Sequence, residues 1–162
     1  SSLYTLADVI NAGCRDGELD VRGISHRGYF ASITDFKSYH DANMDLIDYK
    51  TATDLFHDNW PIYTRTNNSC PTHYFDTANV SNSVISNGSM IEGTVENSIV
   101  GRGCTIKKGA VIKNCVVLAD CTIGENVHIE NLVVDKHAKI THAKEIIRPA
   151  GEPGYIKRND TL

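Results

Sequence analysis

The chain has 162 residues, a formal net charge of −4 and a hydrophobic content of 41%, which suits one or two domains with a hydrophobic core. The acidic balance leaves no dominant basic face and so argues against nucleic-acid binding. No apolar run approaches the roughly 18 residues that a membrane span needs. The chain opens with Ser-Ser and carries no signal peptide, so we expect a fragment or processed chain of a cytoplasmic protein.

Residues 1–48 are predicted to have mixed α/β character. An apolar face with a spacing of three to four residues predicts a short helix over Thr5–Ala12. Gly13 is expected to end this helix, because glycine is the usual residue just beyond a helix C-terminus. The segment Val21–Ile33 is predicted to be extended chain.

A second helix is predicted to begin after a Thr34 or Asp35 cap and to run through Asp48. Residues 49–76 contain two prolines and the polar run Thr66–Ser69. This composition is typical of a connector, so we expect a linker between two structural regions.

From about Thr77 the sequence repeats itself. Each copy has an apolar residue, an asparagine two positions later, two further apolar residues and then an isoleucine after five variable positions. The offsets between copies are 15, 17 and 17 residues. The copies are Val80–Ile91, Val95–Ile106, Ile112–Ile123 and Ile129–Ile140.

Apolar positions within each copy recur about every six residues, which fits neither a heptad nor the 3.6-residue period of a helix. A six-residue unit used three times per coil predicts a left-handed parallel β-helix, the hexapeptide-repeat solenoid. We expect this mainly β domain over residues 77–147. The polar tail, residues 148–162, is predicted either to cap the open end, to lie at a subunit contact or to be disordered at its last residues.

The repeated asparagines are predicted to form a structural ladder. They are Asn82, Asn97, Asn114 and Asn131. Asparagine tolerates the left-handed backbone conformation that a tight corner needs. Its side-chain amides also stack well from strand to strand in parallel, in-register structures. Both explanations assign these residues to architecture.

Five cysteines without a Cys-x-x-Cys pair argue against a zinc site. Cys104 and Cys121 occupy matching places in successive repeats and are candidates for stacked neighbours. A disulfide between them is geometrically conceivable. We favour reduced thiols that pack as small hydrophobic side chains.

Three segments resemble the ADP-glucose pyrophosphorylase (glucose-1-phosphate adenylyltransferase) family in the family's order. They are Gly28–Ile47, Asn59–Thr72 and Asn82–Ile106. The resemblance implies a nucleotidyltransferase domain followed by a β-helix, with residues 1–48 as the end of the first domain. It also implies the reaction of ATP with glucose-1-phosphate to give ADP-glucose and pyrophosphate, for glycogen biosynthesis. The family's glycine-rich nucleotide-binding segment and its sugar-phosphate lysine are absent from this sequence.

Ser32 is the main departure from the catalytic members of that family. Their matching segment reads approximately GYWxDVGT, and its Asp is understood as a ligand of Mg²⁺, the cofactor expected only for the full catalytic enzyme. Ser32 stands at the Asp position and Thr34 at that of the last Gly. A neutral hydroxyl cannot replace a carboxylate at Mg²⁺.

The resemblance therefore favours a regulatory, GlgD-type subunit that acts in assembly and allosteric regulation and is not itself catalytic. Such a subunit is expected to associate with a catalytic subunit, with itself or with both. We predict no catalytic residue and no metal site in this chain. The alternative is a fragment of a catalytic subunit with an unusual metal loop.

Basic residues are candidates for contacts to the phosphate of a sugar-phosphate effector, which the resemblance places where the column meets the catalytic domain. The candidates are Arg65, Arg102, Lys107, Lys108 and Lys113, with Lys136, Lys139 and Arg148 further along the chain. Charged side chains of this kind can grip a phosphate. The competing interpretation is a solvated face that carries charge for solubility.

Hexapeptide acyltransferases share the predicted column and use a histidine as general base, which gives a further alternative. His128, His137 and His142 lie in or just after the repeats. None is predicted on a long projecting loop, so we interpret them as solvated side chains.

Overall fold

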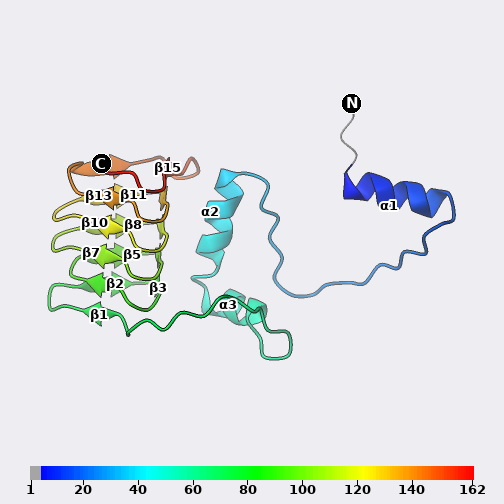
Figure 1. Cartoon of the computed structure of the whole chain (residues 1–162), viewed down its shortest axis with the longest axis horizontal. Coiled ribbons are helices and arrows are strands. Elements are labelled where there is room, and N and C mark those ends of the chain that lie inside the picture. Colours follow the sequence, from blue (N-terminus) through cyan, green and yellow to red (C-terminus); the bar gives the residue numbers. More distant parts are fainter. Residues whose placement is uncertain (1–4) are drawn as a thin grey trace.

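The structure is a computed structural model that describes residues 5–162. Three helices come first in the chain, and a column of short stacked strands follows them (Figure 1). None of the helices in the described part of the chain is long and apolar enough to cross a membrane.

The column is built from three parallel sheets, each with five strands, and every coil of the chain contributes one strand to each sheet. The first sheet contains β1 (His73–Tyr74), β4 (Met90–Ile91), β7 (Thr105–Ile106), β10 (Thr122–Ile123) and β13 (Lys139–Ile140). The second contains β2 (Asn79–Ser81), β5 (Thr94–Glu96), β8 (Val111–Lys113), β11 (His128–Glu130) and β14 (Glu145–Ile147). The third contains β3 (Val84–Ile85), β6 (Ile99–Val100), β9 (Val116–Val117), β12 (Leu132–Val134) and β15 (Gly154–Ile156). The predicted hexapeptide-repeat β-solenoid is confirmed.

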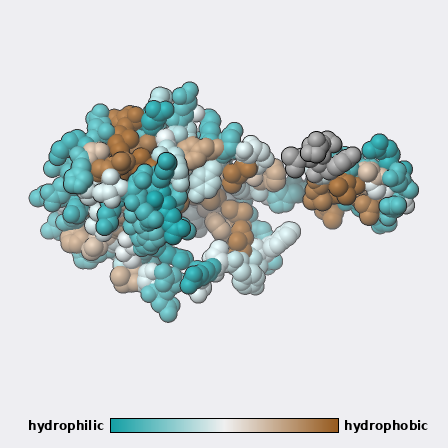
Figure 2. Space-filling model, turned by 45° about the horizontal axis from the view of Figure 1, so that its top comes forward, coloured by the Kyte–Doolittle hydropathy of each residue, from teal (hydrophilic) through white to brown (hydrophobic). Residues whose placement is uncertain are grey.

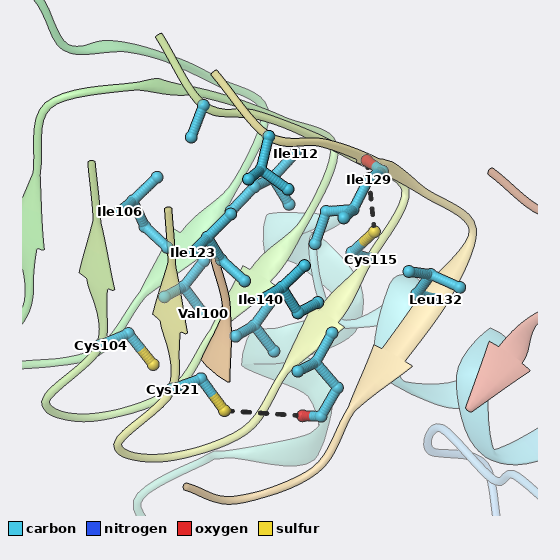
Figure 3. Close-up of a cluster of buried hydrophobic side chains, with 14 of the residues drawn as sticks. Val100, Cys104, Ile106, Ile112, Cys115, Cys121, Ile123, Ile129, Leu132 and Ile140 are labelled. Atoms are coloured by element: carbon cyan, nitrogen blue, oxygen red, sulfur yellow. Dashed lines mark hydrogen bonds between the residues drawn. The ribbon is translucent and has the colours of Figure 1, made fainter. Parts of the chain in front are cut away.

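The core of the column consists of rows of identical or similar side chains, one row for each sheet. In the first sheet, Ile106, Ile123 and Ile140 are aligned strand by strand and are fully buried. Figure 3 shows these side chains pointing into the interior together with Ile112 and Ile129 of the second sheet. Because alternate residues of a strand point to opposite faces, a six-residue unit places one large apolar side chain inward on each side of the column.

The four repeated asparagines all lie at one corner of the column, between the second and third sheets, and all have left-handed backbone conformations with φ of 42–54°. Nδ2 of Asn82 donates to Oδ1 of Asn97 at 2.8 Å, and Nδ2 of Asn97 donates to Oδ1 of Asn114 at 2.6 Å. Nδ2 of Asn131 donates instead to the carbonyl of Arg148 at 2.6 Å. The left-handed backbone conformations match the predicted conformational role of these asparagines. The amide hydrogen bonds that join Asn82, Asn97 and Asn114 match the predicted stacking role.

The first helix, α1 (Leu6–Arg15), is longer than predicted. Thr5 is its N-cap and forms a capping box with Asp8. The prediction that Gly13 ends the helix is wrong, because Gly13 lies within it and Gly17, with φ of 73°, follows its end. Glycine inside a helix costs only about 1 kcal/mol. At Gly13 a Cβ atom would approach Leu19 Cδ1 to 2.5 Å, so a side chain at this position would clash with Leu19.

The second helix, α2 (Phe36–Asp45), begins as predicted, because Asp35 Oδ1 accepts a hydrogen bond from the Ser38 amide at 2.7 Å. Its predicted extension to Asp48 is wrong. Asp48 instead caps a third helix, α3 (Tyr49–Leu55), by accepting from the Thr51 amide at 2.8 Å. The segment predicted as a linker, residues 49–76, therefore contains a helix and also strand β1. Residues 5–72 contain helices and irregular chain, without a strand in this described part.

Helix α2 lies against the outer face of the third sheet (Figure 1). Val116 and Val133 are buried there, although neither side chain belongs to the interior core of the column. His40, also buried, donates through Nε2 to the carbonyl of Asn114 at 2.9 Å. This contact ties α2 to the asparagine corner.

The tail caps one end of the column. Strand β15 pairs with β12, and Ile156 is buried against the core. The Leu162 amide then donates to the carbonyl of Lys139 at 2.9 Å. Of the three predicted states of the tail, the structure shows the cap. Its hydrogen bonds satisfy backbone groups that would otherwise be free at an open sheet edge.

Candidate functional site

The corner between the third and first sheets carries a cleft of about 470 Å³. Its lining residues come from three successive coils, from the tail and from the segment that precedes β1. They are Arg65, Thr66, Asn67, Arg102, Ala119, Asp120, Lys136, His137 and Arg158. Four of these side chains are cationic and only one is a carboxylate, so the cleft carries excess positive charge.

The solenoid repeat places these cations together. The Asp120 amide donates to the Arg102 carbonyl at 2.8 Å, and the Asn159 amide donates to the Lys136 carbonyl at 3.1 Å. Arg102 and Lys136 therefore occupy the same corner two coils apart, with Ala119 on the coil between them, and Arg158 follows Lys136 on the next turn of the chain. Coils stack about 4.8 Å apart, so charges from different coils can reach one anion.

The remaining cation reaches the cleft from outside the column. Arg65 belongs to the irregular segment between α3 and β1, and its carbonyl accepts from the Arg102 guanidinium at 3.5 Å. Thr66 and Asn67 follow it along the rim and supply neutral hydrogen-bonding groups. Guanidinium and ammonium groups converging on a concave surface form a site suited to phosphate-like anions.

The acidic member of the cleft is partly engaged by its own neighbour. Asp120 Oδ2 lies 3.7 Å from His137 Nδ1, and both residues have left-handed backbone conformations at equivalent corners. As a single carboxylate among four cationic side chains, Asp120 offsets only part of the charge that the arginines and lysine supply.

Two of the five basic residues predicted as effector contacts lie in the cleft, namely Arg65 and Arg102. The structure places Lys107 and Lys108 on the turn between β7 and β8, at another corner. Lys113 is on the outer face of the second sheet, where its Nζ lies 3.5 Å from Glu96 Oε2. The five residues are therefore not brought together.

Sequence reasoning missed two cleft residues as phosphate contacts, His137 and Arg158. The 17-residue repeat offset relates Ala119 to Lys136 and, in the same way, Asp120 to His137. The sequence therefore contained enough information to place His137 beside Asp120. Arg158 follows Lys136 by 22 residues. Its place in the stack depends on a longer excursion of the tail that the repeat does not encode.

A hydrogen-bonded pair borders the cleft. Asp135 Oδ1 accepts from the Lys136 amide at 2.7 Å, and its Oδ2 accepts from the Tyr155 hydroxyl at 2.7 Å. The hydroxyl holds the pKa of Asp135 below its usual range, and the carboxylate in turn raises the pKa of Tyr155. Both directions follow from a hydrogen bond that favours the ionised carboxylate and the protonated phenol.

The histidines predicted for the acyltransferase alternative do not converge. His128 lies on the second sheet with Nε2 2.7 Å from Glu130 Oε1. His137 lines the cleft, and His142 follows β13, where its amide donates to the Leu162 carbonyl at 2.8 Å. Ser32 lies in the exposed, irregular segment before α2. Across residues 5–162 there is no cluster of three or more histidine, cysteine, aspartate or glutamate side chains placed to hold a metal ion.

The three cysteines of the column are buried free thiols. Cys104 and Cys121 stack in successive coils of the core (Figure 3). The neighbouring thiol of Cys121 and burial raise the pKa of Cys104, and burial raises the pKa of Cys115 to about 12. The hydrogen bond from Cys104 lowers the pKa of Cys121. All three thiols lie in the core of the column at 1% exposure or less, so these residues act as packing side chains.

The family model described as GlmU-like, C-terminal hexapeptide, matches residues 71–148. The chain is 42% identical over 86 residues to a glucose-1-phosphate adenylyltransferase of Geobacillus stearothermophilus, covering 53% of this chain and 22% of that protein. It is 36% identical over 122 residues to the same enzyme of Bacillus mycoides, covering 75% and 32%. It is 38% identical over 133 residues to the glycogen biosynthesis protein GlgD of Bacillus subtilis, covering 82% and 39%.

These matches span less than two fifths of each relative's own length. The family-model match includes the repeats that build the column, and the GlgD match covers the largest share of this chain among the three relatives. The chain belongs to the family of glucose-1-phosphate adenylyltransferases and GlgD proteins, of which it carries the C-terminal hexapeptide-repeat region.

Proposed function

We propose that this chain is the assembly and regulatory solenoid region of a GlgD-type subunit and that it is not itself catalytic. The enzyme it serves would make ADP-glucose and pyrophosphate from ATP and glucose-1-phosphate in the cytoplasm, for glycogen biosynthesis. Ser32 supports the regulatory assignment because a serine cannot supply the anionic ligand that Mg²⁺ requires. The observation that carries the proposal is the cationic cleft, which the solenoid builds from stacked corner residues.

The effector proposed for the cleft is a sugar phosphate. The cleft of about 470 Å³ can hold a ligand of that size, and its polar rim suits hydroxyl groups. The cations lie on separate coils and on the Arg65 segment, so a ligand that contacts all of them would brace the column against the chain that precedes it. This bracing gives a physical route from ligand binding to regulation.

Association with a catalytic subunit is the second part of the proposal. Leu6 and Val9 of α1 are 76% and 56% exposed, and Trp60 is 74% exposed. Figure 2 shows hydrophobic surface over α1, which lies apart from the column. Exposed apolar surface of this kind is typical of a contact with another protein surface.

A specific observation also favours a second candidate function, a fragment of a catalytic subunit. Two of the relatives described above are adenylyltransferases, one of them with the highest identity of the three. On this alternative, Ser32 would lie in an unusual metal loop and the nucleotide would bind in a separate domain.

Incubating the chain with Mg²⁺, ATP and glucose-1-phosphate is expected to release no pyrophosphate above the protein-free rate. The reason is that no glycine-rich loop for the ATP phosphates and no carboxylate at position 32 is present. A coupled pyrophosphate assay, with a complete catalytic subunit as positive control, measures this. Steady turnover by the chain alone would refute the non-catalytic assignment.

Replacing Lys136 with alanine is expected to weaken the binding of inorganic phosphate by about tenfold, because a charge-assisted hydrogen bond contributes about 1.5–3 kcal/mol. Lys107→Ala is the matched control, since it removes the same charge from an exposed turn at another corner. Isothermal titration calorimetry with phosphate and with a sugar bisphosphate measures both affinities. Equal losses in the two variants would show that net charge, rather than the cleft, determines binding.

A further inference from the structure

A hydrogen-bonded clasp connects the two strands that lead into the cleft. Asp135 immediately precedes Lys136, and Tyr155 lies three residues before Arg158. The Tyr155 hydroxyl donates to Asp135 Oδ2, while Asp135 Oδ1 accepts from the amide of Lys136, each at 2.7 Å. The Asp135 carboxylate therefore orients the backbone of Lys136 and also strand β15, which ends two residues before Arg158.

The same tyrosine also contacts α2. The ring of Phe36, the first residue of α2, meets the ring of Tyr155 edge to face, with 5.7 Å between the ring centroids and an angle of 72°. This arrangement is the one that aromatic quadrupoles favour. Tyr155 thus uses its hydroxyl toward the cleft and its ring toward the helix.

Besides the pairing of β15 with β12, backbone hydrogen bonds hold the tail on both sides of Arg158. The Asn159 amide donates to the Lys136 carbonyl at 3.1 Å, and the Lys139 amide donates to the Asp160 carbonyl at 2.7 Å. Since β15 is the last strand of its sheet, these backbone bonds lie at the edge of the column. Edge elements open more readily than internal ones, so a side-chain clasp at this point has a strong influence on the position of Arg158.

We propose that Tyr155 is a positioning residue of the cleft, which couples the spacing of Lys136 and Arg158 to the docking of α2, so that anion binding and α2 docking strengthen each other. The inference rests on the proposed anion-binding function of the cleft. The Tyr155–Asp135 hydrogen bond preorganises the two cations, and the Phe36 contact makes that arrangement more stable when α2 is docked. Linkage requires the reciprocal effect, in which a bound anion holds α2 more firmly on the third sheet.

The test is Tyr155→Phe, which removes the hydroxyl and keeps the ring. Its affinity for inorganic phosphate is expected to fall by about fivefold, the lower end of measured couplings between sites. Tyr49→Phe is the matched control, because Tyr49 is 82% exposed and lies on α3 away from the cleft. Isothermal titration calorimetry gives the affinities, and circular dichroism checks that both variants are folded.

Hydrogen exchange of the α2 amides supplies a readout that a purely local role would not change. In the wild-type chain, phosphate is expected to slow exchange in Phe36–Asp45, and in Tyr155→Phe this slowing is expected to shrink. A second variant, Phe36→Leu, keeps the hydroxyl bond and removes the aromatic contact. It is expected to lose the α2 response to phosphate even if Tyr155→Phe folds poorly.

The outcomes separate the inference from the function on which it rests. A wild-type chain that fails to bind phosphate overturns the anion cleft and the coupling together. Normal binding by the wild type, with unchanged affinity in Tyr155→Phe and an unchanged α2 response in both variants, overturns the coupling alone. Reduced affinity with an unchanged α2 response also overturns it, because the clasp would then act only within the cleft.

Discussion

Replacing Ile129 with alanine is expected to lower the free energy of unfolding by about 3 kcal/mol, because truncating a buried isoleucine removes apolar contacts and leaves a cavity. Ile129 is fully buried and is aligned between Ile112 and Ile146 of the second sheet. Each coil of a solenoid is stabilised chiefly by its neighbours, so the cavity would weaken two coil–coil contacts at once. Urea unfolding followed by far-ultraviolet circular dichroism measures the change.

Ile147→Ala is the matched control for this prediction. Ile147 belongs to the adjacent strand β14 and is 45% exposed, so its truncation is expected to cost about 0.5 kcal/mol. The same side chain is removed in both variants, and only its direction relative to the core differs. Similar losses in the two variants would contradict the inward and outward assignment of the second sheet.

The column was predictable because its signal is local and repeated. An isoleucine or valine points inward about every six residues, and an asparagine recurs at the same place in each coil. Once this period is recognised, it predicts the solenoid fold. The helix ends were less predictable. Asp48 is compatible with either the end of one helix or the N-cap of the next. In the structure its carboxylate accepts a hydrogen bond from the Thr51 amide, which makes it the N-cap of α3.

The cleft was only half predictable, for a geometric reason. Arg102, Lys107 and Lys113 are five or six residues apart, which is the spacing between successive sides of the column. Residues that share a corner are about one coil apart, as Ala119 and Lys136 are. Grouping cations that are close in sequence therefore combined residues that the fold places on different sides of the column. Cations that stack at one corner are found instead by comparing positions one or more full coils apart. The contribution of Arg65 depended on the path of an irregular segment that has no periodic signal.

Replacing Asn114 with alanine is expected to lower the free energy of unfolding by about 2 kcal/mol. Asn114 has φ of 50°, and the left-handed region costs an ordinary residue about 1–2 kcal/mol. Alanine also removes the Oδ1 acceptor of the hydrogen bond from Asn97, a net contribution of about 1 kcal/mol. The His40 contact would remain, because it is made to the backbone carbonyl of Asn114.

Asn114→Gly separates the two roles of the asparagine, because glycine adopts positive φ without steric cost but has no amide. We expect this variant to recover the backbone part of the loss and to retain the part due to the missing hydrogen bond. Asn82→Ala should cost less than Asn114→Ala, since Asn82 is exposed and lies in the first coil. Melting temperatures and urea midpoints for the three variants measure these differences. Equal and negligible losses in all three would refute both the conformational and the hydrogen-bonding role of the ladder, and the corner would then be stabilised by the sheets on either side.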